Sequence, residues 1–195
     1  MKLIPDNKLL EFLRTRRSSK PAMMSAPGPS DEQLQQILEI AARVPDHKKL
    51  VPWRFIVFAG EARSRAGEVF AKACAAEESD APSEARIAFE KERFNRAPVV
   101  IAVISAVKPV TAVPEWEQIL SAGASAYNLC LAANAMGFAT AWITEWVAYS
   151  PMVRAALGLA DNERVAGFVY VGSASQRQEE RERPALSEVV SYWQG

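Results

Sequence analysis

Apolar and polar residues follow two kinds of pattern along the chain. Apolar residues recur every three or four positions at 9–13, 34–41, 61–80 and 115–136, which predicts helices with one buried face. Nearly continuous apolar runs at 54–60, 98–107, 138–144 and 164–174 predict strands. Helices and strands therefore alternate, which indicates an α+β or α/β layered architecture without internal repeats. We expect residues 1–195 to form a single domain, because a chain of this length can bury one sizeable core.

Several helix ends are marked by residues with known capping preferences. Asp6 can cap the first helix, and Ser30 with Gln33 has the spacing of a capping box at the start of the second. Pro114 is expected at the first position of the long helix, which should end at Gly137. These local signals predict where three of the helices begin.

Two stretches indicate close packing. Residues 98–107, PVVIAVISAV, are continuous, β-branched and apolar, as expected of a strand in the middle of a sheet that is covered on both faces. Residues 121–126, SAGASA, are all small, so another helix can approach the long helix closely there. That neighbour belongs either to the same chain or to the second subunit of a dimer, and the pattern fits both.

The charge balance limits the classes of partner. Lys and Arg together number 23, as do Asp and Glu, so the formal net charge is zero and no global field attracts nucleic acid or an anionic membrane. We therefore expect neither as a partner, and any small anion must be bound by a local cluster of basic residues. No segment has the apolar length that crosses a bilayer.

The N-terminus and the cysteines predict the compartment. The first residues carry charges throughout and lack the apolar core and cleavage site of a signal peptide. Cys74 and Cys130 are far apart and form no C-x-x-C motif, so neither a disulfide framework nor a zinc site is indicated. Reduced thiols fit the cytoplasm, which is the location we expect.

Common catalytic motifs are absent from the sequence. It contains no G-x-G-x-x-G after a strand, no Walker A loop and no G-x-S-x-G elbow. The single histidine, His47, argues against a catalytic zinc site, and its neighbour Asp46 is too little for a catalytic triad. The common dinucleotide-binding, NTPase and hydrolase classes therefore lack their usual signatures in this sequence.

Basic residues near the N-terminus form the first candidate site. Arg16, Arg17 and Ser18 follow the first helix and offer two planar guanidinium groups and a hydroxyl, a set suited to a phosphate or the polar edge of a ring. The alternative is structural, because positive charge also stabilises the C-terminus of a helix. The residue types alone leave both interpretations open.

The loop between the second helix and the first long strand is the second candidate. Arg43 and His47 lie in residues 42–55, ARVPDHKKLVPWRF, a composition that looks more like a binding surface than an ordinary turn. In the alternative interpretation the loop is a rigid connector, with His47 bound to a backbone carbonyl and Trp53 filling the core. Trp142, Ile143 and Thr144 form the end of a strand, and by themselves indicate nothing more.

Taken in order, these segments resemble a known family. The RRS triplet at 16–18, RVPDHKKLVPWRFIVF at 43–58, the helix and strand at 116–144 and VAGFVYVGS at 165–173 are similar to the nitroreductase family of FMN-dependent oxidoreductases. The resemblance spans about residues 8–175 and is strongest for the small YdjA-like branch. It implies a three-layer α+β fold with a central, mostly antiparallel sheet in an intertwined homodimer that binds FMN at both interface sites.

The resemblance also implies an activity and a set of site residues. NADH or NADPH would reduce the flavin, and a nitroaromatic, a quinone or a related small acceptor would then reoxidise it in ping-pong turnover. The implied cofactor-binding residues are Arg16, Arg17 and Ser18 at the phosphate and pyrimidine edge, Arg43 and His47 from the partner subunit, Trp142, Ile143 and Thr144 along the ring, and Arg181 or Arg183 at the phosphate. Residues 132–137 match a stretch associated with the nicotinamide cofactor.

Two features separate this chain from its relatives and leave alternatives open. Glu145 and Trp146 follow the ring-lining segment where relatives carry a small residue, so we expect them to narrow the substrate side of the ring or to repel anions. One alternative is the same fold and flavin with another reaction, such as flavin fragmentation or dehalogenation. The other is a flavin-binding protein with little turnover, if Trp146 blocks the ring. The physiological acceptor and the choice between NADH and NADPH are not predicted.

Overall fold

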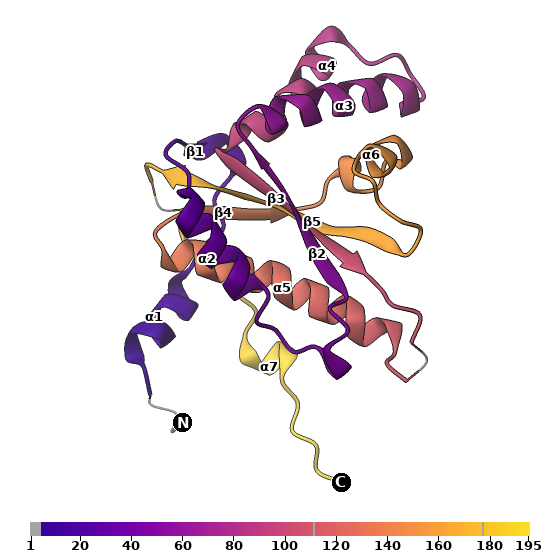
Figure 1. The fold of residues 1–195 in the computed structure, drawn as a ribbon. Helices are drawn as coiled ribbons and strands as arrows, with labels where there is room; N and C mark the ends of the chain where they lie inside the picture. The colour runs from indigo at the N-terminus through magenta and orange to yellow at the C-terminus, as the bar shows by residue number, and fades with distance from the viewer. Residues whose placement is uncertain (1–4, 111, 177) are drawn as a thin grey trace.

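The protein is built in three layers around a β-sheet (Figure 1). The computed structural model describes residues 5–110, 112–176 and 178–195. Helices α2 (Asp31–Ala41) and α5 (Glu115–Ala135) cover one face of the sheet. Helices α3 (Glu61–Glu77) and α6 (Pro151–Ala156) cover the other, with α4 (Glu84–Lys91) packed beside α3. The predicted three-layer α+β architecture is confirmed.

The sheet of the described residues has five strands, and every pairing is antiparallel. The strands are β1 (Met24–Ser25), β2 (Trp53–Ala59), β3 (Val99–Ala106), β4 (Ala139–Ile143) and β5 (Glu163–Ala174). Their order is β1-β5-β3-β2, and β4 also pairs with β5. The prediction that the sheet is mostly antiparallel is confirmed.

Strand β3 lies between β5 and β2, and all of its residues are buried, as predicted. Successive side chains of a strand point to opposite faces, so β3 contributes to two hydrophobic clusters. Ala102 and Ile104 join the cluster under α3, where the Phe94 ring is surrounded by four other aromatic rings. Ile101 and Val103 join the cluster under α2 and α5.

The capping predictions are confirmed, with one shift. The Asp6 carboxylate accepts hydrogen bonds from two backbone N–H groups of α1 (Asn7–Thr15), and Ser30 and Gln33 form the expected capping box. Pro114 is the N-cap of α5 rather than its first residue, because its backbone is extended at ψ 141°. Gly137 follows α5 with φ 87°, a conformation that glycine adopts without strain.

Five short elements complete the chain. They are the 3₁₀ turns η1 (Pro21–Met23), η2 (His47–Lys49), η3 (Phe94–Arg96) and η4 (Trp146–Ala148), and the helix α7 (Leu186–Val189), which projects away from the body of the protein in Figure 1. Residues 21–30 contain three prolines and a glycine, a composition that predicts a loop, and this prediction is wrong at Met24 and Ser25. These two residues pair with the end of β5, and a two-residue strand is too short to give a periodic signal. None of the described helices is long and apolar enough to cross a membrane.

The small residues of α5 let α2 pack closely within one chain. Ser125 Oγ donates a hydrogen bond to the Ala41 carbonyl at 2.9 Å, and Ser121 Oγ donates to the Pro45 carbonyl at 2.7 Å. The predicted close approach is therefore present, and it fixes the loop after α2 against the first half of α5.

Candidate functional site

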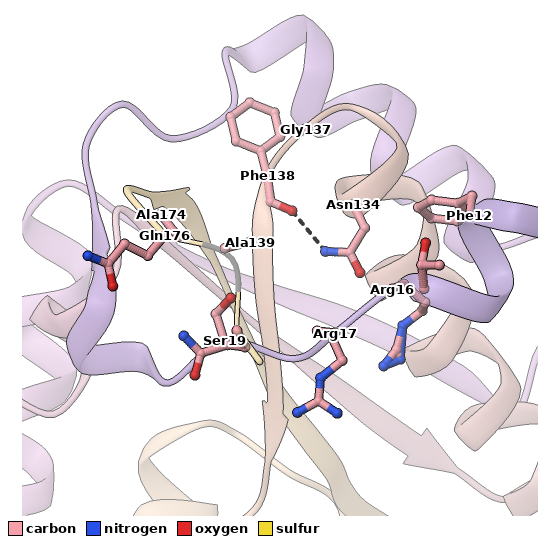
Figure 2. A pocket seen from close by; sticks show the side chains of 12 residues that line it. Phe12, Arg16, Arg17, Ser19, Asn134, Gly137, Phe138, Ala139, Ala174 and Gln176 are labelled. Carbon is pink, nitrogen blue, oxygen red and sulfur yellow. Dashed lines mark hydrogen bonds between the residues drawn. The ribbon is translucent and has the colours of Figure 1, made fainter. Parts of the chain in front are cut away.

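A cavity of about 390 Å³ lies where the end of α1, the start of β4 and the end of β5 meet (Figure 2). Three segments that are far apart in sequence line it: Phe12, Thr15, Arg16, Arg17 and Ser19; Asn134, Gly137, Phe138 and Ala139; and Ala174, Gln176 and Gln178. None of these lining residues is acidic, and two are arginines. The cavity is therefore electropositive, and its size falls in the range of small-molecule sites.

Arg16 and Arg17 reach this cavity because α1 ends immediately before them. Arg16 is the C-cap of α1 and has an extended backbone, so the chain leaves the helix there. Ser19 then donates its backbone N–H to the Thr140 carbonyl at 2.9 Å, which anchors the segment to β4. Figure 2 shows the side chains of Arg16 and Arg17 among the residues that line the cavity. Ser18 lies between these residues, is exposed and does not line the cavity.

Both arginines have hydrogen-bond donors left to offer. Among the described residues, the Nε atoms of Arg16 and Arg17 are buried and have no hydrogen-bond partner. A buried charged donor without an acceptor costs free energy, so such donors are rare unless they serve a ligand. The guanidinium of Arg16 also lies over the Tyr127 ring, 5.5 Å from its centroid, which holds it in place. The arrangement is suited to binding an anion.

The C-terminal segment reaches the same arginines through a carboxylate. Glu180 Oε1 lies 3.3 Å from Arg17 Nη1 and 3.0 Å from Arg183 Nη2. The pKa of Glu180 is lowered, first by the hydrogen bond that its carboxylate accepts from the Arg181 backbone N–H and then by Arg183. Arg183 is thus brought to the edge of the cavity, whereas Arg181 contributes only its backbone to this contact.

Trp142, Ile143 and Thr144 are not part of the lining of this cavity, whose nearest lining residue on the same strand is Ala139. They follow Thr140 on β4, the strand that anchors Ser19. The Trp142 Nε1–H donates to the Ala166 carbonyl at 3.1 Å, and the indole lies so close to Gly167 that a Cβ there would be 1.9 Å from Nε1. Trp142 is therefore held flat against β5, with 40% of its surface exposed.

His47 occupies a second, separate cavity of about 320 Å³ beside α5. Its Nδ1 lies 2.8 Å from Glu117 Oε2, so its partner is a carboxylate and not the backbone carbonyl of the alternative interpretation. Arg43 is exposed on the same loop, and its carbonyl accepts a hydrogen bond from Asn128 of α5. The Trp53 indole is partly buried and donates to Ser121 Oγ at 3.2 Å.

The backbone of the His47 loop is strained and strongly held. Lys48, Lys49 and Val51 have φ of 59°, 54° and 49°, values that residues with a side chain rarely adopt. The Asp46 carboxylate accepts hydrogen bonds from the N–H groups of Leu50 and Val51, which supports this conformation. Strain of this kind is common at functional sites.

The two cavities are separate within one chain. Glu117, the partner of His47, and Asn134, in the wall of the arginine cavity, lie on the same helix and are separated by about 25 Å at 1.5 Å per residue. The structure thus brings Arg16, Arg17 and Arg183 together and leaves His47 at a distance.

Glu145 and Trp146 do not stand free beside β4. The Glu145 carboxylate contacts the guanidinium groups of Arg93 and Arg96, so its charge is paired. The Trp146 ring lies 5.8 Å from the Arg86 guanidinium and 6.0 Å from that of Arg93, and it packs against the core under α3. A paired carboxylate repels anions much less than a free one, so the structure does not support the expected repulsion.

Sequence reasoning missed the residues that complete both cavities. Glu117 lies 70 positions from His47 in sequence, and no local pattern connects the two residues. Glu180, Gln176 and Tyr127 were not singled out, because their contacts with the arginine segment cross most of the chain. The family resemblance pointed to this part of the chain, through Arg181 or Arg183.

Comparison with known proteins identifies related sequences and folds. The family model described as "Nitroreductase family" matches residues 13–173. The chain is 38% identical over 166 residues to the "Putative NAD(P)H nitroreductase YdjA" of Escherichia coli strain K12, covering 84% of this chain and 87% of the relative. It is 40% identical over 172 residues to a "Putative NAD(P)H nitroreductase" of Haemophilus influenzae, covering 87% and 90%.

Solved structures share the fold at lower sequence identity. A nitroreductase-like family protein from Bacillus cereus superposes with a TM-score of 0.82 at 20% identity over the whole of both chains. A nitroreductase from Bacteroides fragilis with bound FMN gives a TM-score of 0.72 at 22% identity, covering 97% of this chain and all of the other.

Proposed function

The chain belongs to the nitroreductase family, and from this premise we propose that it is an FMN-dependent oxidoreductase that uses NADH or NADPH to reduce a small acceptor. The acceptors we propose are nitroaromatics, quinones or related compounds, reduced by a ping-pong mechanism. The observation that carries the proposal is the pair Arg16 and Arg17, whose buried Nε donors lack partners at the wall of a cavity.

The donors at this cavity fit FMN, the group bound in the Bacteroides fragilis relative. The phosphate of FMN is a dianion, and adjacent guanidinium groups are the side chains best suited to bind it. We assign Arg16, Arg17 and Ser18 to the phosphate and the pyrimidine edge. The Glu180 carboxylate contacts both Arg17 and Arg183. If the phosphate displaces this carboxylate, Arg183 can bind the phosphate together with Arg17.

The chemistry itself would belong to FMN, which when bound accepts a hydride from a nicotinamide and passes electrons to the acceptor. The protein then has to bind, orient and shield the reactants, which explains why the sequence carries no nucleophile or metal-binding motif. The arginines supply positive charge near the site and stabilise negative charge that develops there. We assign ring lining to Trp142, Ile143 and Thr144, which are positioned by β4 and β5.

Asn134 and Gly137 support a place for the nicotinamide cofactor. They belong to the stretch 132–137 and form a wall of the same cavity as Arg16 and Arg17. We therefore propose that NADH or NADPH approaches from this side.

We propose that two chains form an intertwined homodimer, in which Arg43 and His47 of one subunit complete the site of the other. The separation of the two sites supports this, because His47 does not line the cavity of its own chain, and its partner Glu117 lies about 25 Å along α5 from Asn134. Trp116, Leu120 and Tyr127 are 66%, 53% and 43% exposed on α5, an apolar surface typical of a contact with another subunit. Tyr192 and Trp193, near the projecting C-terminus, are also exposed.

Two further proposals concern organisation and compartment. We propose that residues 1–195 are one domain, since a single sheet carries both hydrophobic clusters. We also propose a reducing compartment, the cytoplasm, because Cys74 and Cys130 are free thiols.

The alternative reactions differ in how well the structure supports them. Low turnover would require Trp146 to block the flavin, yet this indole packs against the core under α3. Trp142 is paired with Val169, whose side chain faces α5. The Trp142 indole therefore lies on the α5 side of the sheet, whereas the Trp146 indole lies on the α3 side. Flavin fragmentation and dehalogenation remain alternatives that product analysis would separate.

The first experiment is an absorption spectrum of the purified protein with FMN, before and after anaerobic addition of NADH or NADPH. We expect flavin bands that bleach with the nicotinamide and return with a nitroaromatic. The double variant Arg16→Ala/Arg17→Ala should lose FMN, whereas Arg14→Ala, an exposed arginine in the last turn of α1, is the matched control. Full FMN affinity in the double variant, or no FMN uptake by the wild type, would contradict the proposal.

A further inference from the structure

Six charged side chains converge between the α3–α4 hairpin and the end of β4. We call them the charged cluster: Glu78, Arg86, Glu90, Arg93, Arg96 and Glu145. Three are acidic and three are basic, so the cluster is formally neutral. It links the C-terminal end of α3, α4 and η3 to the residue that follows the segment we assign to the flavin ring.

The centre of the charged cluster is fully buried. Glu90 is 0% exposed and Arg93 is 2% exposed. Arg93 binds both oxygens of Glu90 through Nε and Nη2, and Arg86 contacts the same carboxylate. A bidentate pair of this kind has one preferred geometry, so the contact with Glu90 alone is enough to fix the position of the Arg93 guanidinium.

Arg93 and Arg96 together hold the Glu145 side chain. Arg93 Nη1 contacts Glu145 Oε2, and Arg96 Nη2 lies 3.3 Å from the same oxygen. Arg96 is itself fixed by a hydrogen bond to the Tyr170 hydroxyl at 3.2 Å. The Glu145 carboxylate therefore has two guanidinium partners, each anchored to a separate part of the core.

The backbone of Glu145 is strained. Its φ is 56° and its ψ is 179°, close to the region that only glycine populates readily. A residue with a side chain stays in such a conformation only when its surroundings enforce it. Here the Glu145 carbonyl accepts a hydrogen bond from the Ala148 N–H at 3.2 Å, and the two ion pairs are the contacts that the Glu145 side chain adds.

Glu145 lies in the turn between Trp142 and Trp146, whose indole rings are both held in place. Trp142, three residues before it, is bonded to the Ala166 carbonyl on the α5 side of the sheet. Trp146, the next residue, packs with Arg86 and Arg93 on the α3 side. The conformation of residue 145 thus sets how the chain leaves β4 after Ile143 and Thr144.

We propose that Glu145 is a positioning residue, whose ion pairs with Arg93 and Arg96 hold the turn after β4 and thereby fix Trp142, Ile143 and Thr144 for FMN binding. The identity of the ligand rests on the proposed function, whereas the conformation of the turn does not. Glu145 acts through its backbone, and its own charge need not touch the ligand.

Substitution by glycine separates this role from a role of the charge. Glu145→Gly removes the carboxylate and also removes the strain, so the turn keeps its conformation. Glu145→Ala and Glu145→Gln remove the negative charge, and with it the ion pairs with Arg93 and Arg96. Both substituted residues still have a Cβ, so the backbone conformation at residue 145 remains strained and is no longer held by ion pairs. Glu84→Ala, which removes an exposed carboxylate of nearby α4, is the matched control.

The experiment measures the Kd for FMN by quenching of flavin fluorescence, together with the near-ultraviolet circular dichroism of the apoprotein, which reports on the tryptophans. Thermal unfolding verifies that each variant is folded. We expect Glu145→Gly and the control to bind FMN within about threefold of the wild type, and Glu145→Ala and Glu145→Gln to bind it about tenfold more weakly. The tryptophan signal should persist in Glu145→Gly and change in Glu145→Ala.

Two results would overturn the proposal. If Glu145→Gly is as weak as Glu145→Ala, the residue acts through its charge; if all three variants equal the wild type, it positions nothing. If the wild type itself fails to bind FMN, the proposed function fails, and the dichroism decides the positioning role. If the tryptophan dichroism changes in Glu145→Ala and is like that of the wild type in Glu145→Gly, the positioning role is supported. If the dichroism is unchanged in all variants, the positioning role is refuted.

Arg96→Gln supplies an independent variant if Glu145→Ala does not fold. It removes one of the two guanidinium partners and leaves the buried pair of Glu90 and Arg93 intact. We expect a loss of FMN affinity of about threefold, in the same direction as Glu145→Gln. Wild-type affinity in Arg96→Gln would contradict a role for this ion pair.

Discussion

Glu180 and Arg17 are joined by an ion pair between the C-terminal segment and the end of α1, with Glu180 Oε1 3.3 Å from Arg17 Nη1. The same oxygen accepts a hydrogen bond from Arg183 at 3.0 Å. A carboxylate therefore occupies the position between two guanidinium groups where the proposed function has a phosphate.

Replacing this carboxylate should strengthen cofactor binding. Glu180→Gln removes the negative charge that competes with the phosphate of FMN, and exposed ion pairs of this kind are weak. We expect the Kd for FMN to fall by about two- to fivefold, and less at high salt. Fluorescence titration at two ionic strengths measures the effect, with the adjacent Glu179→Gln as the control. Weaker FMN binding by Glu180→Gln would mean that Glu180 orders Arg17 and Arg183 for the phosphate and does not compete with the phosphate for them.

A cross-subunit site makes a prediction about mixed dimers. Arg16→Ala/Arg17→Ala and Arg43→Ala/His47→Ala should each lose FMN when expressed alone. If the two groups act from different subunits, a mixed dimer contains one intact site and one doubly defective site. Random co-expression should then restore about a quarter of the wild-type FMN content, measured by absorbance. No recovery in a mixture proven to contain mixed dimers would show that both groups act within one chain.

The ion pair of Arg54 and Glu163 should make stability depend on pH. Arg54 Nε and Nη2 donate to the two carboxylate oxygens at 2.6 and 2.8 Å, and these bonds are the main reason that the pKa of Glu163 falls to about 2. A carboxyl whose pKa is lower in the folded state stabilises the protein above its unfolded pKa of about 4.5, and this contribution is lost as the pH falls toward 2.

Glu163→Gln tests this contribution directly. We expect it to lower the free energy of unfolding at pH 7 by about 2 kcal/mol, and to lose less further stability than the wild type between pH 4.5 and 2. Urea unfolding at several pH values provides the measurement. Parallel pH profiles for the variant and the wild type would refute the prediction.

Gly167 allows Trp142 to lie against β5, so a side chain there should displace the indole. A Cβ at residue 167 would be 1.9 Å from Trp142 Nε1. We expect Gly167→Ala to break the bond between Trp142 and the Ala166 carbonyl, to shift the tryptophan fluorescence and to cost about 1–3 kcal/mol of stability. An unchanged emission spectrum in Gly167→Ala would argue against this packing.

Much of the fold was predictable from local patterns. The central position of β3 follows from its continuous β-branched run, and the starts of α1 and α2 follow from Asp6 and from Ser30 with Gln33. The antiparallel sheet and the three layers were implied by the family resemblance. The observed strand pairings are all antiparallel, and helices cover both faces of the sheet. Among the described strands, β1 was missed, because its two residues pair with the end of β5 and have no periodicity of their own.

The sequence by itself determined the helices and strands, their caps and the basic residues Arg16 and Arg17, because each depends on neighbours only a few positions away. The tertiary structure decided which of these side chains meet. Glu117 reaches His47, Glu180 reaches Arg17 and Arg93 reaches Glu145 across long separations in sequence. Such pairs depend on strand register and on how helices pack against the sheet, which no local pattern specifies.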